Sequence, residues 1–103
     1  MSLDVTRAEP HPDEARRHLE HARVSRLAQL QALDETRQTT DAYLVSKQSS
    51  AMKRVLREIE EAFTRIDEGT YGACQDCAKP IPAERLEILP YTRYCVACQR
   101  RAS

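Results

Sequence analysis

Four cysteines are the residues of this sequence best suited to chemistry. They form two C-x-x-C pairs, Cys74/Cys77 and Cys95/Cys98, separated by residues 78–94. Two residues between cysteines allow one tight turn to aim both sulfurs at a common point, and a second such turn completes a tetrahedron around Zn²⁺. The spacing between the two pairs is typical of four-thiolate zinc sites. We therefore predict one structural zinc ion held by these four cysteines.

Other uses of the cysteines are less well supported by the sequence. A redox C-x-x-C pair is expected beside a βαβ pattern, which the sequence does not show. An iron–sulfur cluster also uses four cysteines, but nothing in the sequence favours it over zinc. The N-terminal residues lack the apolar segment of a secretory signal, and no stretch is long and apolar enough to span a membrane. We expect a cytoplasmic protein without membrane association, in which disulfides are disfavoured.

The sequence also argues against an enzyme. Four thiolates around zinc leave no open position for a catalytic water. We find no nucleophile placed with a base, no glycine-rich phosphate loop and no paired inward carboxylates. The predicted role of the metal is therefore structural, and we expect no enzymatic activity.

The charge balance bears on nucleic-acid binding. Lys and Arg together number 16, as do Asp and Glu, so the formal net charge is zero. Proteins that bind the phosphate backbone usually carry a basic excess. We therefore do not expect non-specific nucleic-acid binding. Charged residues make up 31% of the chain and aromatic residues 5%, which is typical of exposed helices rather than a thick core.

The first two-thirds of the chain show helical periodicity. Residues 1–12 lack it and are predicted to form a mobile tail, whereas residues 13–69 contain two narrow apolar stripes. The first stripe comprises Leu19, Ala22, Leu27, Leu30 and Leu33. The second comprises Met52, Val55, Ile59, Ala62 and Ile66, in the alternating steps of a coiled coil. Each stripe needs a partner in water, so we predict an antiparallel helical hairpin over residues 13–69 that ends at Gly69.

The hairpin tip is expected near residues 36–46, where Asp41 is positioned to cap the returning helix. Residues 70–103 form the predicted zinc module with a short helix after Pro82. Ala78, after the first cysteine pair, occupies a position that favours glycine because a positive φ is expected there. The predicted fold is thus mainly α: a coiled-coil hairpin followed by a small four-cysteine zinc module.

One continuous segment carries a family resemblance. The sequence "RIDEGTYGACQDCAKPIPAERLEILPYTRYCVACQ", residues 65–99, resembles the C4-type zinc finger of the DksA/TraR family of bacterial transcription regulators. The shared features are the G-T-Y-G-x-C opening, both C-x-x-C pairs and the segment "KPIPAERLEILP". The resemblance implies a protein that binds RNA polymerase and does not bind DNA sequence-specifically. It implies that the coiled coil inserts into the secondary channel, where acidic residues at the tip act near the active site.

The tip matches the family pattern only in part. The family motif is D-x-x-D-x-A, and the nearest segment here is "QTTDAY", with Gln38 and Tyr43 in place of the first Asp and the Ala. Asp41 carries over to the second acidic position and Ala42 follows it. The segment "LDET" supplies Asp34 and Glu35 at a different spacing. The resemblance thus points to Asp34, Glu35, Asp41 and Ala42 as the partner-binding tip.

Two functional hypotheses follow. The first is a monomeric transcription regulator that binds RNA polymerase through the hairpin tip and uses the zinc module as a scaffold. The alternative is a zinc-stabilised helical adaptor or dimerisation module, with or without thiol redox sensing, that does not act on RNA polymerase. The promoters affected, the sign of regulation and any dependence on a nucleotide alarmone are not specified by the sequence.

Overall fold

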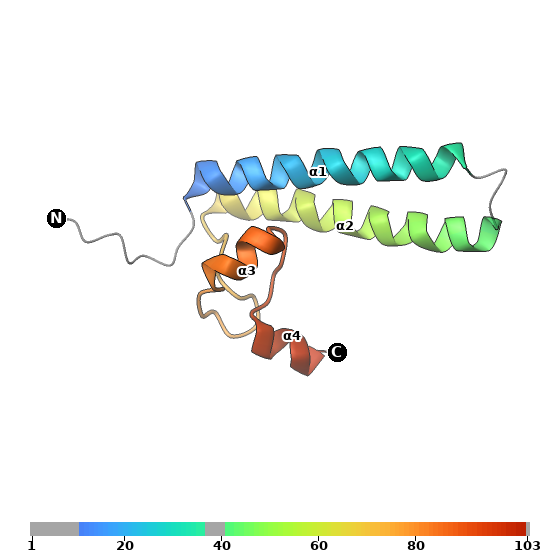
Figure 1. The fold of residues 1–103 in the computed structure, drawn as a ribbon. Coiled ribbons are helices and arrows are strands. Elements are labelled where there is room, and N and C mark those ends of the chain that lie inside the picture. Colours follow the sequence, from blue (N-terminus) through green and yellow to red (C-terminus); the bar gives the residue numbers. More distant parts are fainter. Residues whose placement is uncertain (1–10, 37–40, 103) are drawn as a thin grey trace.

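A computed structural model describes residues 11–36 and 41–102 (Figure 1). The helices are α1 (Pro12–Glu35), α2 (Ala42–Glu68), α3 (Ala83–Ile88) and α4 (Val96–Ala102). The described residues contain no strand, only an isolated antiparallel bridge between Ala73 and Pro80. The mainly helical prediction is confirmed. The predicted tail, up to residue 10, and residues 37–40 of the predicted tip lie outside the described residues.

Helix α1 begins as its sequence indicates. The His11 side chain accepts a hydrogen bond from the Asp13 amide at 3.2 Å, and Pro12 occupies the first turn, where its missing N–H is not needed. At the other end, the Thr36 amide donates to the carbonyls of Ala32 and Leu33. With 24 residues, α1 is about 36 Å long.

Helix α2 is capped at both ends by residues that the sequence singles out. The Asp41 carboxylate accepts a hydrogen bond from the Tyr43 amide at 2.9 Å. Gly69 ends the helix with φ of 80°, and the Thr70 amide then bonds to the Arg65 carbonyl at 2.9 Å. Glycine adopts this left-handed conformation without a steric cost. The predicted helix stop at Gly69 is confirmed.

Helices α1 and α2 run side by side in opposite directions (Figure 1). Leu19, Ile59 and Ala62 are fully buried at the seam, the set of residues through which the two helices face each other. Half-buried apolar side chains pack around them: Ala22, Val55, Leu56, Phe63 and Ile66. The heptad pattern of α2 therefore identified the interface correctly near Gly69.

The expected apolar stripe of α1 is wrong at Leu27, which is 48% exposed. Steps of three and four residues from Leu19 reach Ala22 and then Arg26, which is half-buried, so Leu27 is rotated about 100° away from the seam. Towards the tip, the seam continues through Val45 and Ser49, which are buried and were not predicted.

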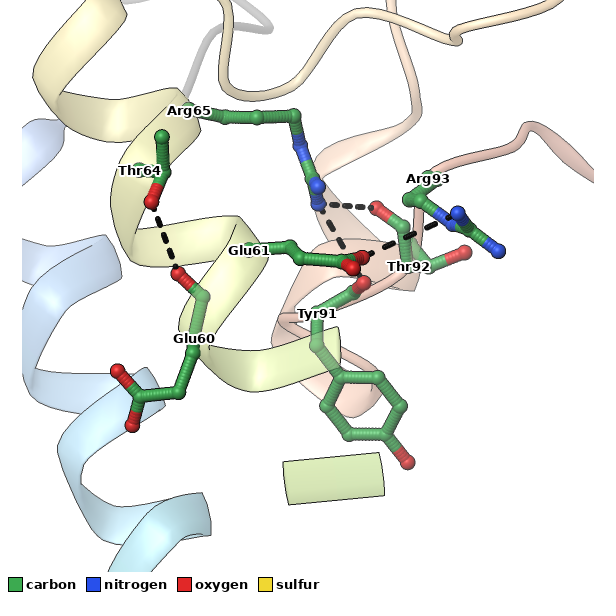
Figure 2. Close-up of polar contacts among 7 residues, drawn as sticks. All are labelled: Glu60, Glu61, Thr64, Arg65, Tyr91, Thr92 and Arg93. Carbon is green, nitrogen blue, oxygen red and sulfur yellow. Dashed lines mark hydrogen bonds and ion pairs between the residues drawn. The ribbon is translucent and has the colours of Figure 1, made fainter. Parts of the chain in front are cut away.

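The zinc module packs against one end of the hairpin. Tyr71 and Tyr91 contact the cluster of Leu19, Ile59 and Ala62. Arg65 is only 5% exposed, and its guanidinium donates to the carbonyls of Tyr91 and Thr92, both at 3.4 Å (Figure 2). We call this end of the hairpin, residues 11–23 and 59–68, the base, and the remainder, residues 24–36 and 41–58, the distal half.

The described helices do not meet the requirements for a membrane-spanning helix. None of them combines the length and the apolar character that a bilayer crossing requires.

Candidate metal centre and hairpin tip

The four cysteine sulfurs converge on one point, as predicted. All four lie within 4.8 Å of one another, and the sulfurs of Cys77 and Cys95 are 3.9 Å apart. Zn–S bonds of about 2.3 Å place the sulfurs of a tetrahedral site about 3.8 Å apart. The four side chains therefore fit a zinc ion, with Cys74 and Cys98 buried and Cys77 and Cys95 half-buried.

The first cysteine pair sits on a tight turn held by backbone hydrogen bonds. The Cys74 amide donates to the Lys79 carbonyl and the Ala78 amide donates to the Cys74 carbonyl, both at 2.9 Å. Ala78 has φ of 68°, so the expected positive φ is confirmed. An alanine in this region costs about 1 kcal/mol relative to glycine, which a metal bound with about 10 kcal/mol can offset.

The second cysteine pair is built on a helix instead of a loop. Cys95 directly precedes α4, and its carbonyl accepts the Gln99 amide at 2.9 Å. Cys98 lies in the first turn of α4, and the fixed spacing of that turn sets its sulfur near that of Cys95. The two pairs thus reach the same geometry through different local structures.

A small core supports both cysteine pairs. Ile81 and Leu86 are buried with Cys74 and Cys98, and Tyr71 and Tyr94 pack at the edge. Two side-chain hydrogen bonds tie the segment between the cysteine pairs to its surroundings. Arg85 of α3 donates to the Tyr94 carbonyl at 3.2 Å, and the Tyr71 hydroxyl donates to the Pro90 carbonyl at 2.8 Å. A core of this size gains from a metal as an additional cross-link.

The local electrostatics favour thiolates at part of the cluster. Burial raises the pKa of the Cys74 thiol, but hydrogen bonds from the backbone amides of Cys77, Cys95 and Asp76 outweigh it and lower that pKa to about 6. The pKa of Cys95 is also lowered, chiefly by the Cys98 amide. Burial and the neighbouring cysteines raise the pKa of Cys98. Thiolates are the form that binds metal, so these backbone hydrogen bonds favour the metal-binding form of Cys74 and Cys95.

An arginine offsets part of the negative charge of the cluster. The Arg101 guanidinium lies 3.1 Å from the Cys98 sulfur and 3.6 Å from the Asp76 carboxylate. Four thiolates and one Zn²⁺ carry a net charge of about −2, so a cation here is favourable. When bound, zinc would link the two cysteine pairs without an open coordination position. Four thiolate ligands are typical of a structural zinc site.

The predicted tip residues lie at the end of the hairpin farthest from the zinc module (Figure 1). Asp34 and Glu35 form the last turn of α1, Ala42 begins α2, and all three are exposed. Asp41 is exposed and caps α2 through one carboxylate oxygen, as expected for that position. Gln38 lies outside the described residues. Their partner-binding role remains a prediction.

In the part of the chain that the structure describes, the other metal-binding residue types form no second cluster. His18 and His21 line an open groove of about 260 Å³ between α1 and the segment around α3, together with Arg26, Glu87, Pro90 and Tyr91. Within residues 11–36 and 41–102, the four cysteines are the sole group of three or more ligands close enough to hold a metal.

Comparisons with known proteins agree with this geometry. Residues 69–103 match the model of the prokaryotic dksA/traR C4-type zinc finger. An uncharacterized protein from Aquifex aeolicus is 44% identical over 55 residues, which cover 53% of this chain and 38% of that protein. The RNA polymerase-binding transcription factor DksA from Caulobacter vibrioides is 29% identical over 68 residues, covering 66% of this chain and 48% of that protein. The chain thus matches less than half the length of these relatives.

The whole fold also has a solved counterpart. The structure of transcription factor DksA2 from Pseudomonas aeruginosa superposes with a TM-score of 0.79 and covers 99% of this chain and 90% of that chain, at 23% identity. At this identity the likeness concerns the fold alone. The match at residues 69–103 and the four converging sulfurs together support a zinc finger of the dksA/traR C4 type in this segment of the chain.

Proposed function

We propose that this protein binds RNA polymerase and regulates transcription through the distal end of its hairpin, with the zinc module as scaffold. The proposal draws on the family and on the name of the Caulobacter relative, an RNA polymerase-binding transcription factor. The structural observation that carries it is the acidic end of a thin two-helix projection. Asp34, Glu35 and Asp41 are exposed there.

The acids at the end of α1 gain nothing from the helix dipole. The carbonyl end of a helix has a partial negative charge, so Asp34 and Glu35 are unfavourable in the last turn, which contains no basic residue. Asp41 is different, because it caps α2 and so contributes to stability. Carboxylates at the negative end of a helix dipole are consistent with a partner that recognises negative charge.

The base supports this role by fixing the direction of the hairpin. Tyr71 and Tyr91 fill the space against Leu19, and Arg65 bonds the loop after α3. A partner that contacts the zinc module would then orient the tip. A projection about 36 Å long can reach a site that is remote from the surface on which the module rests.

The test uses charge removal without loss of the cap. Asn caps helices as well as Asp does, so Asp41→Asn should leave the fold intact. We expect the triple variant Asp34→Asn/Glu35→Gln/Asp41→Asn to retain zinc and helicity but to lose its effect on transcription in an assay with core polymerase and the cognate sigma factor. Glu20→Gln, which removes an exposed acid from the middle of α1, is the control. Equal activity of the triple variant and the wild type would contradict the tip assignment.

A second candidate function rests on exposed apolar residues of α1. Val24 is 63% exposed and Leu27 48%, and both belong to the distal half of α1. Such residues suit an adaptor or dimerisation module whose helix pairs with another helix. Light scattering separates the two proposals, because a stable dimer at micromolar concentration favours the adaptor and a monomer favours the polymerase-binding factor.

A further inference from the structure

The charges of α2 are sorted along the helix. Residues 42–57 contain four cations, Lys47, Lys53, Arg54 and Arg57, and no acid. Residues 58–68 contain five acids and one arginine. A chain with no net charge therefore carries a concentrated positive segment on one part of one helix.

These cations lie on the outer side of the hairpin. Lys47, Arg54 and Arg57 follow the same helical spacing as Tyr43 and Ser50, which places them on one face opposite the buried Val45, Ser49 and Ile59. Lys53 lies one turn before Arg57 at the edge of that face. All four side chains are exposed. We call Lys47, Lys53, Arg54 and Arg57 the basic stripe.

The basic stripe is not used by the fold. Among the described residues, the side chains of Lys53, Arg54 and Arg57 have neither a hydrogen bond nor an ion pair, and an i to i+4 pair between Arg54 and Glu58 does not form. Lys47 lies over the Tyr43 ring at 5.4 Å. By contrast, the base pairs its charges across the helices, Arg16 with Asp67 and Arg23 with Glu60. Like charges one turn apart repel, so the stripe works against helix stability.

We propose that the basic stripe docks on an acidic protein surface of RNA polymerase that lies beside the hairpin when the tip is engaged. This inference rests on the proposed function for the identity of the partner. The basic stripe would make a second contact with the polymerase, through positive charges instead of the negative charges of the tip. This contact lies on a helix face that the tip residues do not include.

The extent of the stripe favours a protein over a nucleic acid. From Lys47 to Arg57 the helix advances about 15 Å, and acids bound the stripe at both ends, Asp41 before it and Glu58 after it. A phosphate backbone continuing past either end would meet these carboxylates and those of Asp34 and Glu35. A bounded acidic patch on a protein matches a positive segment of this length without that repulsion.

The experiment measures binding of the full-length, zinc-loaded protein to core polymerase from its source organism at low and high salt. We expect each of Lys53→Glu, Arg54→Glu and Arg57→Glu to weaken binding about fivefold at 50 mM salt, mostly through a slower association rate, with a smaller effect at 500 mM. Arg57→Lys should bind like the wild type. Arg17→Glu reverses an exposed cation on α1 and should change the affinity less than about twofold.

The outcomes separate this inference from the proposed function. If the wild type binds and the three reversals bind equally well, the stripe is not an interface, while polymerase binding stands. If the wild type does not bind polymerase, both proposals fail. If a 20-nucleotide RNA or a DNA duplex binds the wild type at micromolar concentration and the reversals abolish this binding, the partner is a nucleic acid and the inference is overturned. Circular dichroism confirms that each variant is folded.

Discussion

The base and the distal half of the hairpin are made from the same two helices but hold together differently. At the base, Leu19 is fully buried, ion pairs join α1 to α2, and the Arg23 guanidinium stacks on the Phe63 ring at 4.5 Å. Within the described residues of the distal half, Val45 and Ser49 are the buried ones, and Tyr43 and Leu44 are more than half exposed. The difference indicates that stability is concentrated beside the zinc module, whereas the distal surface remains available for a partner.

Loss of the metal should have the largest effect on this asymmetry. Structural zinc in small domains contributes about 10 kcal/mol, and the core around Ile81 and Leu86 is too small to replace it. We expect Cys74→Ser, or chelation of the wild type, to disorder residues 70–102 and to expose the base to proteolysis. Near-UV circular dichroism of the tyrosines and zinc content check this, and an unchanged tyrosine spectrum in metal-free protein would contradict it. Because metal binding requires thiolates, zinc should also be released as the pH falls.

A matched pair of leucines tests the difference in packing directly. Leu19→Ala removes a fully buried side chain at the base and should lower the free energy of unfolding by about 3 kcal/mol. Leu27→Ala makes the same change on the same helix where the side chain is 48% exposed, and it should cost less than about 0.5 kcal/mol. Urea unfolding of both variants measures the two losses in free energy of unfolding. Similar losses would show that the distal half is packed as firmly as the base.

Tyr71 lies where the zinc module joins the base. Burial raises the pKa of Tyr71 to about 12, and its hydroxyl donates to the Pro90 carbonyl at 2.8 Å. Tyr71→Phe should lower the free energy of unfolding by about 1 kcal/mol at neutral pH. A raised pKa means that the neutral hydroxyl stabilises the fold below pH 10 and that this contribution is lost between about pH 10 and pH 12.

The measurement for Tyr71 is a series of urea titrations of wild type and variant from pH 7 to pH 11. The difference between the two proteins should be constant up to about pH 10 and then narrow. If the difference in free energy of unfolding between the two proteins does not change with pH, the hydroxyl is exposed to water and does not bond to the Pro90 carbonyl.

Ser49 is expected to give the smallest effect, with the opposite sign. It is buried at 5% exposure in the seam of the distal half, in the middle of α2. Alanine is the better helix former, so Ser49→Ala should raise the free energy of unfolding by about 0.5 kcal/mol. A gain in thermal stability without a change in polymerase binding would show that the distal seam is not optimised for stability. A loss of stability would mean that the hydroxyl contributes to packing there.

The sequence was sufficient for the metal centre and for the apolar seam of the base, but not for the distal half. Cysteine spacing has few solutions in three dimensions, and Gly69 has a backbone preference that other residues lack, so both features could be predicted. Leu27 was misplaced because the seam of α1 includes the partly buried Arg26, which a search for apolar residues passes over. Ser49 was missed for the same reason.

The junction could not be predicted because it depends on contacts between remote segments. Arg65 resembles an ordinary surface residue in the sequence, yet it is buried where α2 meets the loop after α3. Burial, and then the nearby Arg93, lower the pKa of its guanidinium. Nothing local in "FTRIDEG" indicates that this arginine bonds to carbonyls 26 and 27 residues later in the chain.

Hydrogen–deuterium exchange of the zinc-loaded protein, free and bound to core polymerase, locates the surface that the polymerase covers. We assign the distal half to partner binding and the base to structural support. We therefore expect binding to slow amide exchange most in residues 41–57, with small changes in residues 59–68, which are already packed in the free protein. Protection confined to residues 70–102, with exchange in residues 41–57 unchanged, would contradict this assignment and make the zinc module the binding surface.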